Sequence, residues 1–201
     1  MNKIVILTGL TASGKSGLAV SLASKFGGEI ISCDCVQVYK GLDIGSAKES
    51  LENRQKIKHH LIDIIEPYES YNVSNFVQDC KLAVQECISR NKIPFIVGGT
   101  GMYIKALLEG FSLGSEANLD FRNYWQEYAE KNSKQAVWEE LNQLNPELAS
   151  KVHYNNLNRV IRYLELTKFG LATKSEPVFK DYEILAIGIN EDKELIYPKN
   201  N

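Results

Sequence analysis

The 201-residue sequence lacks a long apolar run, a signal peptide and an excess of charge of either sign. The first two absences argue against a membrane or secreted protein, so we expect a cytoplasmic protein with no membrane partner. The formal net charge of −2 removes the general attraction that basic proteins have for nucleic acid. A nucleic-acid partner would therefore need local basic patches. No internal repeat, heptad pattern or long apolar surface stripe is present, so we expect a monomer.

Cysteine is scarce, with four in the chain. Cys33 and Cys35 are separated by one residue, whereas a zinc knuckle has two or more. Cys80 and Cys87 are seven apart in an amphipathic pattern and suit the buried face of a helix. We expect free thiols in a reducing compartment rather than disulfides or a zinc site.

One motif stands out among the residues that are present. Gly-Leu-Thr-Ala-Ser-Gly-Lys-Ser follows the apolar strand 4–7 and fits the phosphate-loop pattern G-x-x-x-x-G-K-[ST]. Such a loop turns backbone N–H groups toward anionic oxygens, Lys15 adds a charge, and the Ser16 hydroxyl can bind Mg²⁺. The alternative is an ordinary glycine-rich turn. The residues expected to bind a diphosphate or nucleotide are Gly9, Leu10, Thr11, Ala12, Ser13, Gly14, Lys15 and Ser16.

Strand and helix patterns alternate through the first half of the chain. This predicts an α/β fold of the P-loop NTPase type, with a parallel sheet covered by helices on both faces. One helix is expected from the loop to about Lys25, where Gly27 and Gly28 stop it, and another from an N-cap near Ser74. Strands are expected at 4–8, 29–33, 61–65, 93–97 and 184–189.

The strand signal disappears between about residues 114 and 175. Amphipathic patterns instead predict helices over 118–131, 133–143 and 157–169, the last closed by Gly170. We therefore expect three parts: a core over 1–113, an inserted all-helical subdomain over 114–177, and a return strand with a short tail over 178–201. Residues 151–175 hold five basic side chains and one acidic side chain. On spacing alone, Arg159 and Arg162 form an ordinary solvated helix face.

Asp34 sits where the second predicted strand ends, at the edge where open α/β sheets bind ligands. Three roles stay open for it: support of Mg²⁺, general base, or cap of a turn.

The fourth strand runs into Gly98-Gly99-Thr100-Gly101, where a phosphoryl-transferring enzyme would place a metal-binding Asp. This disfavours an ATPase or kinase. The glycines either expose N–H groups to a second anion or permit tight packing between the strand and a helix. For His59 and His60, which point to opposite faces of a strand, we favour a structural role over metal binding.

Together, several blocks resemble the tRNA dimethylallyltransferase (tRNA isopentenyltransferase) family in order and spacing. They are the phosphate loop, 34–39, 43–48, 59–63 and 98–103. A sixth block, 158–165, is similar to that family's tRNA-contacting helix. The resemblance covers residues 3 to about 195.

The resemblance implies transfer of a dimethylallyl group from dimethylallyl diphosphate to the exocyclic amine of an adenosine beside the tRNA anticodon. The loop would hold the donor's diphosphate, with Mg²⁺ as cofactor on Ser16. Asp34 would be the general base, and Thr100 and Lys15 would complete the catalytic set. Gln37 would read the adenine edge, as an amide can. The implied contacts to the anticodon stem-loop are Asp34, Cys35, Val36, Gln37, Thr100, Arg122, Asn158, Arg159 and Arg162.

The chain departs from the family pattern at three points. Cys35 replaces a serine and keeps a small polarisable group, and Leu10 replaces a proline without altering the array of N–H groups in the loop. Family members are also longer, so we expect a C-terminally short chain. Two other functions stay open: a truncated, non-catalytic product that binds tRNA or diphosphate, and a P-loop small-molecule kinase.

Overall fold

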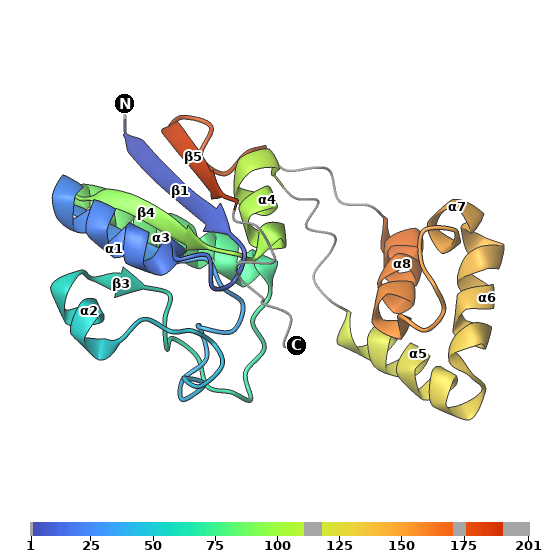
Figure 1. The fold of residues 1–201 in the computed structure, drawn as a ribbon. Helices are drawn as coiled ribbons and strands as arrows, with labels where there is room; N and C mark the ends of the chain where they lie inside the picture. The colour runs from blue at the N-terminus through green and yellow to red at the C-terminus, as the bar shows by residue number, and fades with distance from the viewer. Residues whose placement is uncertain (1, 111–117, 171–175, 191–201) are drawn as a thin grey trace. The chain divides into compact units, whose positions relative to one another are not determined.

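The computed structural model describes residues 2–110, 118–170 and 176–190. Two compact units make up the chain (Figure 1). The sheet unit comprises residues 1–111 and 176–201, and the helical unit comprises residues 112–175. The division expected at 113/114 and 177/178 stays a prediction, because residues 111–117 and 171–175 lie outside the described residues, as does the tail 191–201.

The sheet unit contains a five-stranded, wholly parallel sheet in the order β3-β2-β4-β1-β5. Because β1 lies between β4 and β5, the segment that follows it leaves from the interior of the sheet's carboxyl edge. Leu7 on β1 is in register with Val97 on one side and Ile187 on the other. The strands are β1 (Lys3–Gly9), β2 (Gly28–Ser32), β3 (His59–His60), β4 (Ile93–Gly98) and β5 (Glu183–Ile189).

Helices cover both faces of this sheet, as the sequence predicts. The alternation of β1 sends Leu7 to one face, where it packs with Ala19 and Ala23 of α1 (Lys15–Phe26). Ile4 and Ile6 face the opposite side and join the cluster under α3 (Val73–Ser89) and α4 (Gly101–Glu109). The helix α1 ends at Gly27, whose φ of 67° is the left-handed value typical of a helix end.

Two sequence predictions in this unit are wrong in detail. No strand of the sheet forms over 61–65, and β3 lies before it at His59–His60, because Leu61 and Asp63 have φ values of 60° and 56° that turn the chain out of the sheet. The third helix is capped by Asn72 rather than by Ser74, through a capping box with Asn75. A short helix, α2 (Leu51–Lys56), was not anticipated.

The helical unit contains the three predicted helices and one further short helix. Asn118, Ser133, Asn145 and Asn156 cap them with side-chain oxygens. They enclose a separate apolar core that includes Val137, Leu141, Val160, Ile161 and Leu164. The helices are α5 (Leu119–Lys131), α6 (Lys134–Leu144), α7 (Pro146–Ala149) and α8 (Leu157–Phe169).

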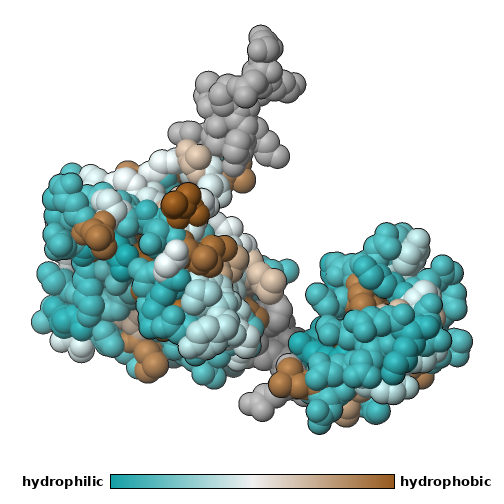
Figure 2. Space-filling model, turned by 90° about the horizontal axis from the view of Figure 1, so that it is seen from below, coloured by the Kyte–Doolittle hydropathy of each residue, from teal (hydrophilic) through white to brown (hydrophobic). Residues whose placement is uncertain are grey.

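Hydrophilic residues dominate the face of the helical unit seen in Figure 2, with isolated hydrophobic ones. Among the described residues, no helix combines the length and apolar character needed to cross a membrane.

Candidate active site

The loop between β1 and α1 has the backbone shape that its motif predicts. Ala12 and Gly14 both have left-handed φ values, 67° and 74°. Alternating left-handed residues turn successive N–H groups to one side, which forms an anion-binding concavity. Gly14 caps α1 without a side-chain hydrogen bond, so the first N–H groups of the helix face the same concavity. The Lys15 ammonium crosses the loop and donates to the Leu10 carbonyl oxygen at 2.8 Å.

A cavity of about 620 Å³ opens on this loop. Its wall brings together residues that the sequence assigns to one site, namely Thr11, Ala12, Ser13, Gly14, Lys15, Ser16, Asp34, Val36 and Gln37. Burial lowers the pKa of Lys15, and the Asp34 carboxylate opposes that shift. The cavity wall thus carries the Lys15 ammonium and the Asp34 carboxylate, which are close enough to influence each other, beside a concavity of backbone donors.

Asp34 lies two residues beyond the end of β2 and caps the turn there. Its Oδ1 atom accepts hydrogen bonds from the backbone N–H groups of Val36, at 2.8 Å, and Gln37, at 3.3 Å. Turn capping, one of the three roles left open, is therefore present. It does not compete with a chemical role, because the bonds orient a carboxylate that still lines the cavity.

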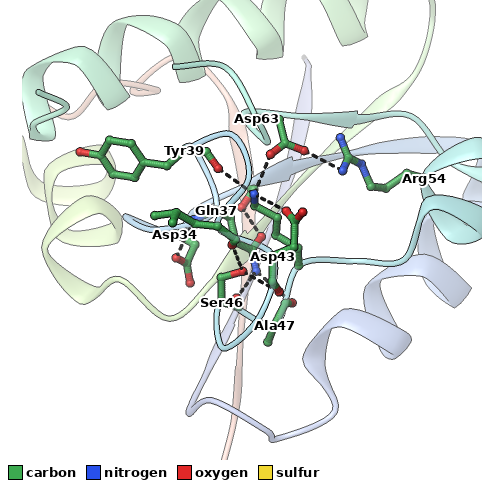
Figure 3. Close-up of polar contacts among 11 residues, drawn as sticks. Asp34, Gln37, Tyr39, Asp43, Ser46, Ala47, Arg54 and Asp63 are labelled. Carbon is green, nitrogen blue, oxygen red and sulfur yellow. Dashed lines mark hydrogen bonds and ion pairs between the residues drawn. The ribbon is translucent and has the colours of Figure 1, made fainter. Parts of the chain in front are cut away.

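Gln37 uses its amide within the protein (Figure 3). The Ser32 hydroxyl donates to Oε1 at 2.9 Å, and Nε2 donates to the carbonyl oxygens of Ser46 and Ala47, each at 3.1 Å. These are the atoms with which Gln37 would read adenine. In this structure Gln37 instead fastens the 46–47 segment to the end of β2, so adenine reading stays a prediction.

Lys48 is the centre of a network that sequence reasoning missed (Figure 3). Its side chain is only 4% exposed and donates to Asp63 at 2.6 Å, Asp43 at 2.8 Å and the Tyr39 carbonyl oxygen at 2.7 Å. Arg54 donates to the second oxygen of Asp63 at 2.8 Å. Burial raises the pKa of Asp63, but these two cations outweigh it and lower the pKa. The network joins the blocks 34–39, 43–48 and 59–63 into one wall of the site. The charged residues in these blocks, Asp43, Lys48 and Asp63, were the features of the sequence that could have indicated it.

Close packing explains the glycine that ends β4. A Cβ atom on Gly98 would lie 2.1 Å from the Cys33 carbonyl oxygen, so this glycine permits close packing against the segment after β2 rather than against a helix. Thr100 is the N-cap residue of α4, and its Oγ1 accepts the Cys35 N–H at 3.2 Å. Thr100 and Cys35 are thus joined to each other next to Asp34, outside the residues that line the cavity.

His59 and His60 have the structural roles expected of them. The ring of His59 bonds the Ile57 carbonyl oxygen, and that of His60 bonds Glu29, both at 2.7 Å. Glu29, His60 and Cys87 come close enough to hold a metal ion.

Two observations argue against a metal there. Arg90 already donates to both oxygens of Glu29, at 3.1 and 2.7 Å, and these bonds with the one to His60 lower the pKa of Glu29 to about 2 despite its burial. Burial raises the pKa of Cys87 to about 12, which keeps the thiol protonated. We assign this cluster to stability. All four cysteines are free thiols.

The basic residues of the helical unit are only partly brought together. Arg122 donates to both oxygens of Glu165, at 3.2 and 2.7 Å, and Arg162 donates to the same carboxylate. Arg159 is instead bonded to the Tyr163 hydroxyl at 3.1 Å, with its guanidinium over that ring. Asn158 is exposed on the first turn of α8. The sequence pairs Arg159 with Arg162, whereas the structure pairs Arg162 with Arg122.

Two family models match this chain. The model described as IPP transferase matches residues 37–201, and the one described as isopentenyl transferase matches residues 2–65. The tRNA dimethylallyltransferase of Ligilactobacillus salivarius is 38% identical over 206 residues, which cover 99% of this chain and 67% of the relative.

Solved structures agree with these matches. The full-length tRNA isopentenylpyrophosphate transferase of Bacillus halodurans is 38% identical, with a TM-score of 0.59, over 94% of this chain and 60% of that one. A eukaryotic dimethylallyltransferase solved while acting on tRNA is 30% identical, with a TM-score of 0.74, over 94% of this chain and 48% of that one. The fold is thus P-loop NTPase-like, and the chain spans about two thirds of the curated relative it matches.

Proposed function

The chain belongs to the IPP transferase family, and from this premise we propose that it transfers a dimethylallyl group from dimethylallyl diphosphate to the exocyclic amine of an adenosine beside the tRNA anticodon. The observation that carries the proposal is the single cavity lined by the phosphate loop, Lys15 and Asp34. It offers donors for a leaving diphosphate and a carboxylate for the attacking amine.

In this proposal the loop binds the diphosphate of the donor. The N–H groups of residues 11–16 and the Lys15 ammonium surround its oxygens. As the bond between the allylic carbon and oxygen breaks, negative charge grows on the leaving diphosphate and positive charge on the allylic carbon. Donors that are already oriented stabilise this separation without reorganising, which is why such arrangements lower barriers.

Asp34 accepts the proton that the amine loses. The adenosine nitrogen forms a bond to the allylic carbon, its N–H proton passes to the carboxylate, and the diphosphate leaves with the electrons of the broken bond. Hydrogen bonds from Val36 and Gln37 to Oδ1 hold the carboxylate in position for this transfer. We also propose Thr100 as a catalytic residue, because its Oγ1 accepts the N–H of Cys35, the residue next to Asp34.

Mg²⁺ fits the oxygen groups of this site. Ser16 lies exposed on the cavity wall, and the carboxylates of Asp34 and Glu49 line the same cavity. Hydroxyl and carboxylate oxygens are the ligands that Mg²⁺ prefers. With Ser16 as its protein ligand, the ion would offset charge on the diphosphate.

The RNA contacts divide between the units. We propose that Asp34, Cys35, Val36, Gln37 and Thr100 surround the adenosine, which must leave its stack to be reached. Arg122, Asn158, Arg159 and Arg162 would bind the anticodon stem-loop, which makes 114–177 the tRNA-binding part. A tRNA substrate and four free thiols support a cytoplasmic setting; a monomeric state stays a prediction.

Mass spectrometry of a modified RNA tests the function. The chain is incubated with an anticodon stem-loop RNA, dimethylallyl diphosphate and Mg²⁺, and we expect the RNA to gain one dimethylallyl group. A matched RNA with inosine at the target position lacks the exocyclic amine and should gain nothing.

Parallel incubations, one with a full-length relative and one with ATP and a nucleoside, distinguish the other two functions. If folded protein binds the RNA without modifying it, while a full-length relative modifies it, the non-catalytic interpretation replaces ours. Phosphorylation of a nucleoside by ATP, without prenyl transfer, would establish the kinase.

A further inference from the structure

Glu165 on α8 is completely buried, yet it carries a charge. Its carboxylate accepts four donors. Two come from Arg122 on α5, through Nε at 3.2 Å and Nη2 at 2.7 Å, and one comes from Nη1 of Arg162 on α8 itself. The fourth is the backbone N–H of Asn118, the N-cap residue of α5, at 2.7 Å. Burial raises the pKa of Glu165, but these bonds outweigh it and lower the pKa.

The carboxylate of Glu165 holds both arginines but leaves some of their N–H donors available for another partner. A guanidinium has five N–H donors, and each arginine directs only part of its fork at Glu165. The side chains of Arg122 and Arg162 are 35% and 29% exposed. Two positive charges against one negative charge leave the group with a net positive charge at the surface.

We propose that Glu165 is a positioning residue that holds Arg122 and Arg162 as a fixed pair of guanidinium groups for two phosphates of an RNA backbone. An arginine that is already oriented loses less side-chain entropy when it binds, and its planar fork matches phosphate oxygens. The inference rests on the proposed function, which assigns RNA to the two arginines and gives Glu165 no role.

The substitution Glu165→Gln separates an effect of charge from an effect of positioning, because the two predict opposite changes in RNA affinity. Glu165→Gln removes a negative charge beside a bound polyanion, so charge alone predicts tighter RNA binding. Gln has one oxygen in place of two and brings an NH₂ group against the guanidinium donors, so it cannot hold both arginines. The positioning role therefore predicts weaker binding.

The experiment measures the affinity of the full chain for an anticodon stem-loop RNA across a series of salt concentrations. Glu147→Gln is the matched control, because Glu147 is an exposed glutamate of the same unit, paired with Lys151 at 2.6 Å. We expect Glu165→Gln to bind about five- to tenfold more weakly, with a salt slope shallower by about 1 to 2. Glu147→Gln should bind as tightly as the wild type or slightly more tightly.

Two further measurements separate positioning from folding. Both tryptophans, Trp125 and Trp138, lie in the helical unit, so their fluorescence reports its unfolding in each variant. In the background Arg122→Gln plus Arg162→Gln, the effect of Glu165→Gln on RNA binding should vanish, since it acts through these arginines. If Glu165→Gln fails to fold, Arg122→Lys serves in its place: it keeps the charge but loses the fork, and should also weaken binding.

Specific outcomes overturn the inference. They are equal affinities for folded Glu165→Gln and Glu147→Gln, an effect that persists without the arginines, or unchanged affinity in Arg122→Lys. In each of these cases salt-dependent binding by the wild type leaves the proposed function standing. A wild-type chain that binds no RNA contradicts the proposed function itself, and the inference with it.

Discussion

The two units orient the groups that we propose bind anions in different ways. In the sheet unit the donors are mostly backbone N–H groups, oriented by left-handed residues at Ala12 and Gly14. In the helical unit they are arginine side chains, oriented by the buried Glu165. A backbone concavity suits a small diphosphate that must be enclosed while a bond breaks, whereas long side chains suit the outer surface of an RNA. If the proposed function holds, the sheet unit supplies the chemistry and the helical unit supplies RNA affinity.

The largest expected effect tests the chemical half of this comparison. Asp34→Asn keeps the oxygen that accepts the Val36 and Gln37 N–H groups but cannot take a proton from the amine. We expect the rate of dimethylallyl transfer to fall by about 10²- to 10⁴-fold, the usual contribution of a general base, with RNA affinity retained. Single-turnover kinetics with the stem-loop RNA measures the rate.

Asp120→Asn provides the control from the other unit, since Asp120 is an exposed residue in the first turn of α5. Its transfer rate should match that of the wild type. A rate for Asp34→Asn close to that of Asp120→Asn would exclude Asp34 as the base.

A second buried glutamate sharpens the comparison. Glu29 in the sheet unit is bonded to Arg90 and His60, as Glu165 is bonded to its arginines. Its pKa of about 2 lies below the ordinary value of 4.5, so its contribution to stability is present above about pH 4.5 and is lost as the pH falls toward 2. At neutral pH, Glu29→Gln should lower the free energy of unfolding by on the order of 3 kcal/mol.

The loss of unfolding free energy is measured by denaturant unfolding at a series of pH values, with hydrogen exchange of the β2 amides as the probe. The variant should show a flatter pH dependence below pH 4.5 than the wild type. Its RNA affinity in the folded state should not change, in contrast to Glu165→Gln. A change in RNA affinity would mean that buried glutamates affect binding through general stability, and the distinction between the units would disappear.

The sequence predicts these two arrangements unequally. The loop from Gly9 to Ser16 is predictable because eight consecutive residues determine its backbone. The strands β1 and β4 are predictable because each is a short apolar run. The segment 61–65 is apolar enough to resemble a strand, yet Asp63 is held by Lys48 and Arg54 in a left-handed turn. No local pattern contains those partners.

The same limit applies to side chains with distant partners. The family resemblance predicts that Gln37 faces a ligand, whereas its bonds to Ser46 and Ala47 depend on how the following loop folds back. Arg122 and Arg162 meet only because α5 packs on α8. Helical spacing relates Arg162 to Arg159, and it carries no information about a residue on another helix.

The smallest expected effect tests whether the two units unfold independently. Asn72 caps α3 with a capping box, whereas Asn156 caps α8 through one bond of 3.4 Å to the Arg159 N–H. Asn72→Ala should cost about 1 kcal/mol, and Asn156→Ala less, because the weaker bond leaves less to lose. Tryptophan fluorescence follows only the helical unit, so it should detect Asn156→Ala and not Asn72→Ala. If both substitutions shift the fluorescence transition equally, the two units unfold as one. The stability of a variant in either unit must then be taken into account before its effect on RNA binding is interpreted.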